Sequence, residues 1–242
     1  ELFARFGDDL TWVLSLELMN HLEEAQRGVE GMFGYITEFV AERRAAPRDD
    51  LVSRLILAED EGDHLSEDEL HMLIGAMLFA GFDTTRNQLG LCMVTFADHP
   101  EPWALLAERP ELTERAVEEC MRFAPTIGIA PRMAAETFEF EGFEIPAGTL
   151  VSLSTAAANH DPGAFVEPDV FDITADREPI FTFGGGPHYC LGASLARAEM
   201  QVALPLLARR LPDLALAGEV QWRPRMGIFG PTVLPLRFTS AT

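Results

Sequence analysis

Phe183-Gly184-Gly185-Gly186-Pro187-His188-Tyr189-Cys190-Leu191-Gly192 is the stretch that decides the interpretation of this chain, because it places a cysteine behind a glycine-rich loop. The apolar pattern that follows predicts a helix from about residue 190 to residue 210. A cysteine at the start of a helix meets free backbone N–H groups and the positive end of the helix dipole, which favour thiolate over thiol. The glycines let the preceding backbone approach the sulfur and aim amides at it.

A shielded thiolate of this kind is a ligand for a soft metal centre, and haem iron is one such centre. We expect Phe183 and Leu191 to shield the sulfur from water. Taken alone, however, a single cysteine is more often a small buried hydrophobic residue. A zinc site would need a second Cys or His pair at close spacing, which the sequence lacks. A dinucleotide loop would need Gly-x-Gly-x-x-Gly, and Tyr189 occupies its sixth position.

The whole ten-residue pattern resembles the haem-binding signature of the cytochrome P450 family, Phe-x-x-Gly-x-x-x-Cys-x-Gly. Its four fixed positions are occupied by Phe183, Gly186, Cys190 and Gly192. The resemblance implies that Cys190 is the metal ligand, on the iron of haem b (iron protoporphyrin IX). It also implies that Phe183, Gly184 and Gly192 contact this cofactor.

The composition narrows the classes of partner. The chain has 242 residues, of which 18 are basic and 39 acidic, so the net charge is −21. This charge argues against nucleic acid and anionic membranes as partners. Cys92, Cys120 and Cys190 lie far apart and do not form a disulfide pattern, which favours a reducing cytoplasm. The sequence shows no signal peptide and no apolar run long enough to span a bilayer.

A long helix is predicted upstream of the cysteine loop. Ser66 and Glu69 form a capping box that opens this helix, and His99-Pro100 ends it. Its middle, residues 80–85, reads Ala-Gly-Phe-Asp-Thr-Thr and places polar groups inside an apolar helix. One interpretation is a tolerated kink with a solvated polar face. The other is a helix opened to hold water or a small ligand.

The same hexapeptide resembles the distal helix motif of the cytochrome P450 family, Ala/Gly-Gly-x-Asp/Glu-Thr-Thr/Ser, at every position. The resemblance implies catalytic roles for two of its side chains. Thr84 would hydrogen-bond bound dioxygen, and Asp83 would feed protons through water. Ala80 and Gly81 would leave room for dioxygen beside the cofactor.

Residues between these two motifs match further features of the family. Glu119 and Arg122 share a helix face within residues 110–123, where the family carries its Glu-x-x-Arg core pair. Arg132 and His188 correspond to residues that pair with the haem propionates. The family's second core arginine is displaced, since Arg177 lies two positions late and Ala175 stands at the ungapped position. The core triad is therefore complete only if Arg177 reaches Glu119.

The resemblance also implies a substrate pocket, walled by Ile127, Gly128 and Ile129. Phe229, in the segment that resembles the family's terminal hairpin, would lie near the substrate. A simple core position is the alternative for Phe229.

The remaining elements follow from local patterns. Residues 1–45 are expected to be mostly helical, with a break near residues 28–34, where three glycines fall. Asp49 or Asp50 is expected to cap a helix over residues 51–59. Glu61-Gly62-Asp63 predicts a turn, and Glu141-Gly142 predicts the turn of a β-hairpin.

These observations predict a mainly α (α+β) fold in which residues 1–242 form a single domain. It resembles the C-terminal part of a bacterial cytochrome P450 haem domain whose N-terminal part is absent. The implied activity is a haem-thiolate monooxygenase that inserts one atom of O₂ into a small apolar organic substrate, with electrons from a ferredoxin and its reductase. A peroxide-dependent haem-thiolate enzyme and a non-catalytic haem-domain fragment remain alternatives. A truncated chain of this kind is expected to expose a large apolar patch and therefore to aggregate, to lose haem or to pair with another copy as a homo-oligomer.

Overall fold

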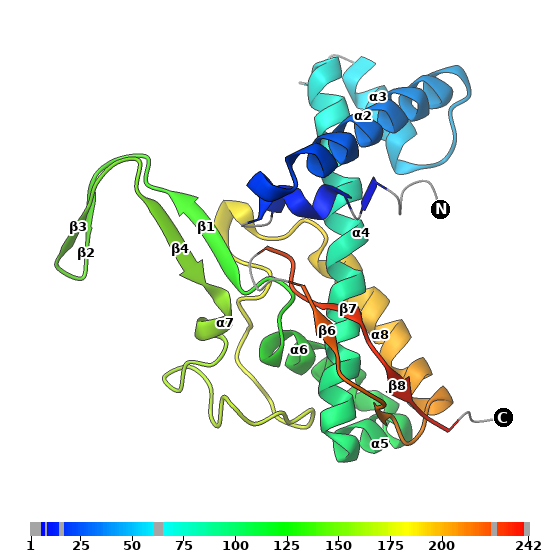
Figure 1. Cartoon of the computed structure of the whole chain (residues 1–242), viewed down its shortest axis with the longest axis vertical. Helices are drawn as coiled ribbons and strands as arrows, with labels where there is room; N and C mark the ends of the chain where they lie inside the picture. The colour runs from blue at the N-terminus through cyan, green and yellow to red at the C-terminus, as the bar shows by residue number, and fades with distance from the viewer. Residues whose placement is uncertain (1–5, 8, 15–16, 61–64, 224–226, 240–242) are drawn as a thin grey trace. The chain divides into compact units, whose positions relative to one another are not determined.

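The computed structural model describes residues 6–7, 9–14, 17–60, 65–223 and 227–239 of the chain (Figure 1). The turn predicted at Glu61-Gly62-Asp63 lies outside these ranges. Helices dominate the described residues, and the strands form small antiparallel pairs, so the predicted mainly α (α+β) class is confirmed. Within the described ranges, no helix is both long and apolar enough to cross a lipid bilayer.

The chain divides into two compact units, residues 1–84 and residues 85–242. Unit 1 contains η1 (Thr11–Leu14), η2 (Leu18–Asn20), α2 (Leu22–Ala45) and α3 (Leu51–Asp60). The long helix α4 (Glu67–Asp98) begins in unit 1 and continues into unit 2. The core of unit 1 is formed by buried apolar side chains of residues Leu10, Met32, Ile36, Val40, Ile56, Leu70 and Ile74.

The helix break expected near residues 28–34 is wrong, because α2 runs unbroken through this range. Two of its glycines instead allow close packing within unit 1. A Cβ added to Gly28 would lie 2.9 Å from the Cβ of Asp9, and one added to Gly31 would overlap the ring of Phe6. Glycine therefore serves here for its small size rather than for its conformational freedom.

The caps of α3 and α4 form as the sequence predicts. Asp50 is the cap of α3, since its Oδ1 accepts the backbone N–H of Ser53 at 2.9 Å. At the start of α4 the capping box is reciprocal. Ser66 N–H donates to Glu69 Oε2 at 2.8 Å, and Glu69 N–H donates to Ser66 Oγ at 3.3 Å. The hydrogen bonds from Ser66 lower the pKa of the Glu69 carboxyl.

In unit 2, α4 is followed by α5 (Pro100–Glu108), η3 (Pro110–Leu112), α6 (Thr113–Phe123) and α8 (Ala193–Arg210). Both α5 and α6 pack against α8. The core between these helices contains the buried residues Cys92, Met93, Phe96, Trp103, Leu106, Leu112, Ala116, Val117, Cys120, Met121, Phe171, Ile173, Met200, Leu204, Ala208 and Leu214.

The strands of unit 2 form four antiparallel pairs among the described residues. β1 (Ile129–Met133) pairs with β4 (Leu150–Ser154), which leads into α7 (Thr155–Ala158), and β2 (Phe138–Phe140) pairs with β3 (Phe143–Ile145). Near the C-terminus, β5 (Ala215–Leu216) pairs with β8 (Leu236–Arg237), and β6 (Gln221–Trp222) pairs with β7 (Pro231–Val233).

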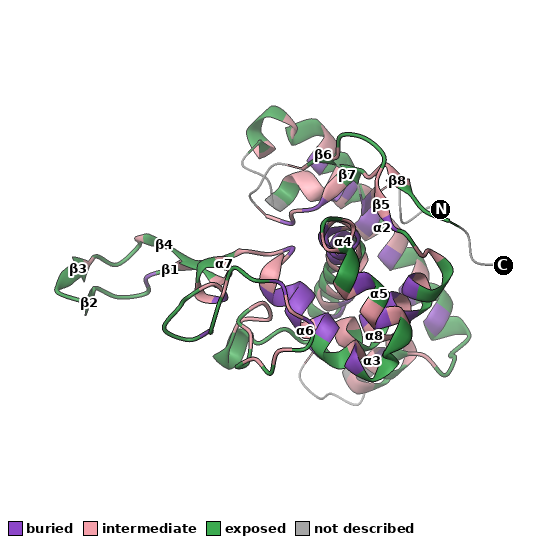
Figure 2. Ribbon diagram, turned by 90° about the horizontal axis from the view of Figure 1, so that it is seen from below, coloured by how far each residue is buried: buried purple, intermediate pink, exposed green. Residues whose placement is uncertain are grey.

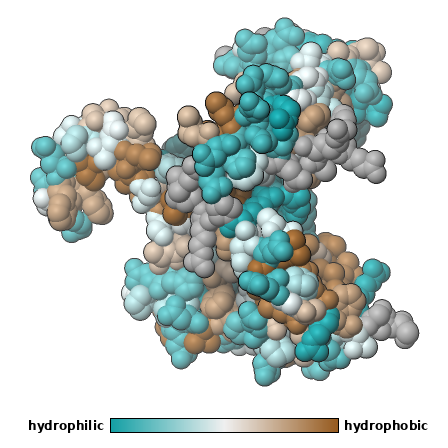
Figure 3. Space-filling model, in the orientation of Figure 1, coloured by the Kyte–Doolittle hydropathy of each residue, from teal (hydrophilic) through white to brown (hydrophobic). Residues whose placement is uncertain are grey.

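The hairpin predicted at Glu141-Gly142 is present between β2 and β3. Both turn residues have positive φ, 51° and 80°, which is the conformation of a tight two-residue hairpin loop. Figure 2 shows this hairpin and the β1–β4 ribbon as mostly exposed. Apolar residues gather on them in Figure 3, and the exposed ones include Met133, Phe138, Phe140, Phe143, Leu150 and Leu153.

Candidate functional site

Cys190 lies at the end of a tightly hydrogen-bonded loop in unit 2. Its backbone N–H donates to the carbonyl of Phe183 at 3.0 Å, which closes the loop, and Tyr189 N–H donates to Gly186 at 3.0 Å. The thiol of Cys190 is exposed. The prediction that the helix begins at Cys190 is wrong by three residues, because α8 begins at Ala193. The amide of Cys190 is thus used to fix the loop instead of lying free in a first helical turn.

Two glycines of this loop are required by its backbone. Gly184 and Gly186 have φ values of 69° and 61°, in the left-handed region that other residues rarely adopt. The short helix η4 (Gly186–His188) follows and leads to Cys190. A Cβ added to Gly186 would meet no atom within 4 Å, so the face of the loop here is open.

The surroundings of the thiol fit a large apolar cofactor. Leu191 is 83% exposed and Leu195 is 63% exposed, close to Cys190 in sequence. The expectation that Leu191 shields the sulfur is therefore wrong, because Leu191 is itself exposed. Phe183, the other residue expected to shield the sulfur, packs against the core of unit 2. A single cysteine, an open glycine face and exposed apolar residues together suit haem better than a tetrahedral zinc site.

The other two cysteines have a different environment. Cys92 and Cys120 are buried in the core of unit 2. Burial raises the pKa of the Cys120 thiol, which keeps it protonated. Among the three cysteines, the exposed Cys190 is thus the one suited to bind a metal.

Arg132 and His188 are placed on separate elements of unit 2. Arg132 lies in β1 opposite Val151, and its Nη1 donates to the carbonyl of the preceding Pro131 at 2.8 Å. His188 ends η4 and is exposed two residues before Cys190. Their roles with the propionates stay predictions.

Asp83 and Thr84 lie within α4, which is helical throughout, so the predicted opening of the helix is not observed. Asp83 is fully buried, which excludes the interpretation of a solvated carboxylate. The hydroxyl of Thr84 donates to the carbonyl of Ala80 at 2.7 Å. This back-bond to the residue four positions earlier satisfies the hydroxyl inside the helix and is a known cause of mild bending. Ala80 and Gly81 are exposed.

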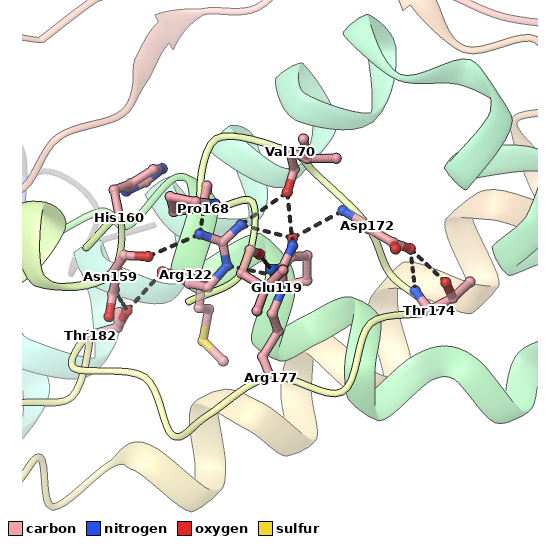
Figure 4. Close-up of polar contacts among 12 residues, drawn as sticks. Glu119, Arg122, Asn159, His160, Pro168, Val170, Asp172, Thr174, Arg177 and Thr182 are labelled. Atoms are coloured by element: carbon pink, nitrogen blue, oxygen red, sulfur yellow. Dashed lines mark hydrogen bonds and ion pairs between the residues drawn. The ribbon is translucent and has the colours of Figure 1, made fainter. Parts of the chain in front are cut away.

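Glu119 and Arg122 form a buried, bidentate ion pair on α6, with oxygen–nitrogen distances of 2.7 and 2.9 Å (Figure 4). The Arg122 guanidinium also donates to the main-chain carbonyls of Asn159, Pro168 and Val170. Both charged side chains are almost completely excluded from solvent, at 0% and 2% exposure. A pair buried this deeply needs partners for its polar atoms, and Glu119 with these three carbonyls supplies an acceptor for every N–H of the Arg122 guanidinium.

Arg177 joins this network from the segment between Phe171 and the cysteine loop. Its Nη2 lies 3.3 Å from Oε1 of Glu119 and 3.0 Å from the carbonyl of Val170, and its Nη1 donates to the carbonyl of Val166. The Glu119–Arg122–Arg177 triad is thus present (Figure 4). Nearby, hydrogen bonds from Thr174 lower the pKa of the Asp172 carboxyl.

The candidate substrate residues are brought together by paired backbone contacts. Phe229 N–H donates to the carbonyl of Thr126 at 2.7 Å, and the Thr126 hydroxyl donates to the carbonyl of Phe229 at 2.7 Å. The next residue, Ile127, accepts the hydroxyl of Thr155 through its carbonyl, and Gly128 accepts the N–H of Ala156. Ile129 opens β1 and is exposed. The C-terminal segment thus lies beside residues 126–129.

One contact of the cysteine loop was missed by sequence reasoning. Arg197 of α8 forms a forked ion pair with Glu118 of α6, at 2.5 and 3.1 Å, and its Nη1 lies 3.1 Å from the hydroxyl of Tyr189. Hydrogen bonding to Glu118 raises the pKa of the Arg197 guanidinium. The partners are 79 residues apart, so no local spacing indicates this pair.

Comparison with known proteins agrees with this arrangement. The sequence profile of the family described as Cytochrome P450 matches residues 8–212. Luteothin monooxygenase from Streptomyces thioluteus is 44% identical over 233 residues, which cover 94% of this chain and 57% of the relative. Mycinamicin IV hydroxylase/epoxidase from Micromonospora griseorubida is 40% identical over 219 residues, which cover 88% of this chain and 55% of the relative.

Solved structures show the same relationship. A crystal structure of P450BioI in complex with hexadec-9Z-enoic acid ligated acyl carrier protein matches with a TM-score of 0.91 and 34% identity. The match covers 98% of this chain and 61% of that chain. This chain therefore spans between 55% and 61% of the length of these three relatives. The matched profile and the shared fold establish that the chain belongs to the cytochrome P450 family, whose members hold haem.

Proposed function

We propose that this protein is a haem-thiolate monooxygenase, which inserts one oxygen atom of O₂ into a small apolar organic molecule while the other atom leaves as water. The electrons come from a ferredoxin and its reductase. The observation that carries the proposal is the exposed thiol of Cys190, at the end of a glycine-rich loop that is closed by the hydrogen bond from the Cys190 N–H to the carbonyl of Phe183. When bound, haem b with a cysteine thiolate supplies the chemistry of O–O bond cleavage.

The cysteine loop and β1 would hold the cofactor. Cys190 is the metal ligand, and the open face at Gly186 leaves room for a flat ring. Arg132 and His188 bind the propionates, Arg132 through charge-assisted hydrogen bonds and His188 through a ring N–H. The Glu119–Arg122–Arg177 triad is structural and keeps the segment before the loop in place.

Asp83 and Thr84 handle protons in this proposal, on the strength of the match of residues 80–85 to the distal motif. The Thr84 hydroxyl donates to Ala80 at 2.7 Å, so its oxygen keeps lone pairs that can accept a further hydrogen bond. Positioned proton transfer by side chains of this type typically accelerates a reaction by about 10²–10⁴-fold.

The substrate class follows from the apolar residues that would line its site. Ile127, Ile129 and Phe229 offer hydrocarbon and aromatic surface, and Gly128 lies between the two isoleucines, where an added Cβ would crowd Ala156 at 3.1 Å. Two relatives are named for a monooxygenase and for a hydroxylase/epoxidase, which agrees with oxygen insertion into a carbon framework. The net charge of −21 and the free cysteines favour a cytoplasmic protein that acts without nucleic acid or membrane.

The test is the absorption spectrum of the ferrous–CO complex after loading the full chain with haem. We expect the strongly red-shifted Soret band of thiolate ligation, its loss in Cys190→Ser, and its retention in the control Cys92→Ala. Turnover with NAD(P)H, a surrogate ferredoxin and its reductase should then yield oxygenated product. Product formed with peroxide alone would favour the peroxide-dependent alternative. Haem binding without either activity would favour the non-catalytic one.

A further inference from the structure

Arg197 connects the two ends of the cysteine loop to α6. It lies on α8, seven residues after Cys190, and its side chain is 28% exposed. Its guanidinium forms a fork on Glu118 at 2.5 and 3.1 Å and donates to the Tyr189 hydroxyl at 3.1 Å. The guanidinium carbon also lies 4.4 Å from the centre of the Phe183 ring, within the range of a cation–π contact.

The loop needs such a contact because its own sequence specifies little. Three consecutive glycines, Gly184 to Gly186, give the unfolded loop many conformations that must be lost when it is ordered. Phe183 and Tyr189 flank these glycines, and the carbonyl of Phe183 accepts the N–H of Cys190. One side chain that contacts both Phe183 and Tyr189 therefore fixes the span between them.

The shape of the arginine side chain matters as well as its charge. The planar guanidinium bonds both carboxylate oxygens of Glu118, leaves a further N–H for Tyr189 and stacks on Phe183. Lysine has a point charge on a flexible stem and cannot make this combination of contacts. Glu118 and Glu119 are neighbours on α6 but bind different arginines, since Glu118 binds Arg197 and Glu119 binds Arg122 and Arg177.

We propose that Arg197 is a positioning residue that holds Cys190 in place by joining Glu118, Tyr189 and Phe183. Glu118 is the fixed point of this connection, because α6 packs against α8 in the core of unit 2. The consequence for the metal ligand rests on the proposed function. The effect on the loop does not rest on the proposed function, since the contacts of Arg197 with Glu118, Tyr189 and Phe183 all lie within the described part of this chain.

The experiment is amide hydrogen exchange on the full chain without cofactor, comparing Arg197→Lys and Arg197→Gln with the control Arg210→Gln. Arg210 lies in the last turn of the same helix and is exposed. We expect the amides of Tyr189 and Cys190 to exchange about tenfold faster in both Arg197 variants, as local opening becomes easier. The amides of α5 and the control should not change. Glu118→Gln should cause a smaller change at the same two amides.

Unchanged exchange at Tyr189 and Cys190 in Arg197→Gln, or wild-type exchange in Arg197→Lys, would overturn the proposal. An equal acceleration across α5, α6 and the loop would also overturn it, because it would show a general loss of stability.

With haem bound, the fraction of the ferrous–CO complex with the red-shifted Soret band should fall in both Arg197 variants. An unchanged fraction would contradict the positioning of the ligand. Absence of the band from the unmodified protein would overturn the proposed function, while the exchange result would still decide on Arg197.

Discussion

The Nη2 atom of Arg177 lies 3.3 Å from Oε1 of Glu119, although Arg177 comes two positions later in the sequence than the family's second core arginine. The same carboxylate oxygen accepts the backbone N–H of Asp172 at 3.0 Å. Arg177 also donates to the carbonyls of Val166 and Val170, so the segment folds around its side chain. The segment thus brings the Arg177 guanidinium to Glu119 despite its later position in the sequence.

Glu119→Ala should strongly destabilise the protein. It removes the partner of Arg122, whose side chain is fully buried, and leaves that charge without its carboxylate. Loss of one member of a buried ion pair typically costs about 3–5 kcal/mol. The measurement is the free energy of unfolding in urea, and retention of far-UV circular dichroism at zero urea confirms that the variant folds.

Glu111→Ala provides the control for this prediction. Glu111 pairs with Arg109 at 2.9 Å, but both side chains are more than half exposed, at 61% and 52%. Such pairs contribute about 0–1 kcal/mol. Similar losses in Glu111→Ala and Glu119→Ala would show that burial of the triad does not determine its contribution.

Thr84→Ala should separate electron consumption from product formation. The variant keeps a good helix former within α4 but lacks the hydroxyl that we propose takes part in proton transfer. Product per NAD(P)H should fall and released peroxide should rise, while haem content stays the same. Thr84→Ser keeps the hydroxyl and should retain most of the yield. Equal product per electron in the alanine variant would remove Thr84 from the mechanism.

Asp50→Asn should reduce stability at neutral pH and have less effect in acid. The N–H of Ser53 and the side chain of Arg43 lower the pKa of Asp50 from 3.8 to about 2. Because the pKa is lower in the folded protein, the carboxylate stabilises the fold above the unfolded value of 3.8, and this contribution is lost as the pH falls through about 2.

The melting temperature measured from about pH 6 down to about pH 2 tests this dependence. The difference between Asp50→Asn and the unmodified protein should shrink across the acidic part of this range. Asp49→Asn is the matched control, because Asp49 is 90% exposed and pairs with Arg54, whose side chain is also exposed. A difference that stays constant down to the lowest pH would contradict the assignment of Asp50 as a charged cap.

Local patterns predicted the elements whose signals lie within a few residues. The capping box at Ser66 and the hairpin at Glu141-Gly142 each formed as expected, because one local set of hydrogen bonds or dihedral angles decides them. Helix α5 was missed because Pro100 was interpreted only as the end of α4. Proline also suits the first turn of a helix, and here it opens one whose Trp103 is buried.

Contacts between distant segments could not be predicted in the same way. Glu118 lacks an arginine three residues on, since Met121 stands there, and its partner Arg197 comes from another helix. The glycines of α2 gave a similar difficulty. Glycine has a low helix propensity, so Gly28 and Gly31 predict a break in the helix. The helix continues because these two positions pack against Asp9 and Phe6. Such outcomes depend on tertiary neighbours that the local sequence does not identify.

Gly230→Ala and Gly34→Ala are the same chemical change and should have opposite effects. A Cβ at Gly230 would lie 2.7 Å from the Cβ of Asn87 on α4, which forces the terminal segment to move. Overpacking of this kind costs about 1–3 kcal/mol. Because Phe229 N–H donates to Thr126 at 2.7 Å, the shift should also disturb the candidate substrate site.

Gly34 is exposed on α2 with no atom within 4 Å of its added Cβ, so alanine there should stabilise the helix by about 0.5–1 kcal/mol. Unfolding in urea gives the sign for each variant, and a stabilised Gly230→Ala would show that the terminal segment does not pack against α4.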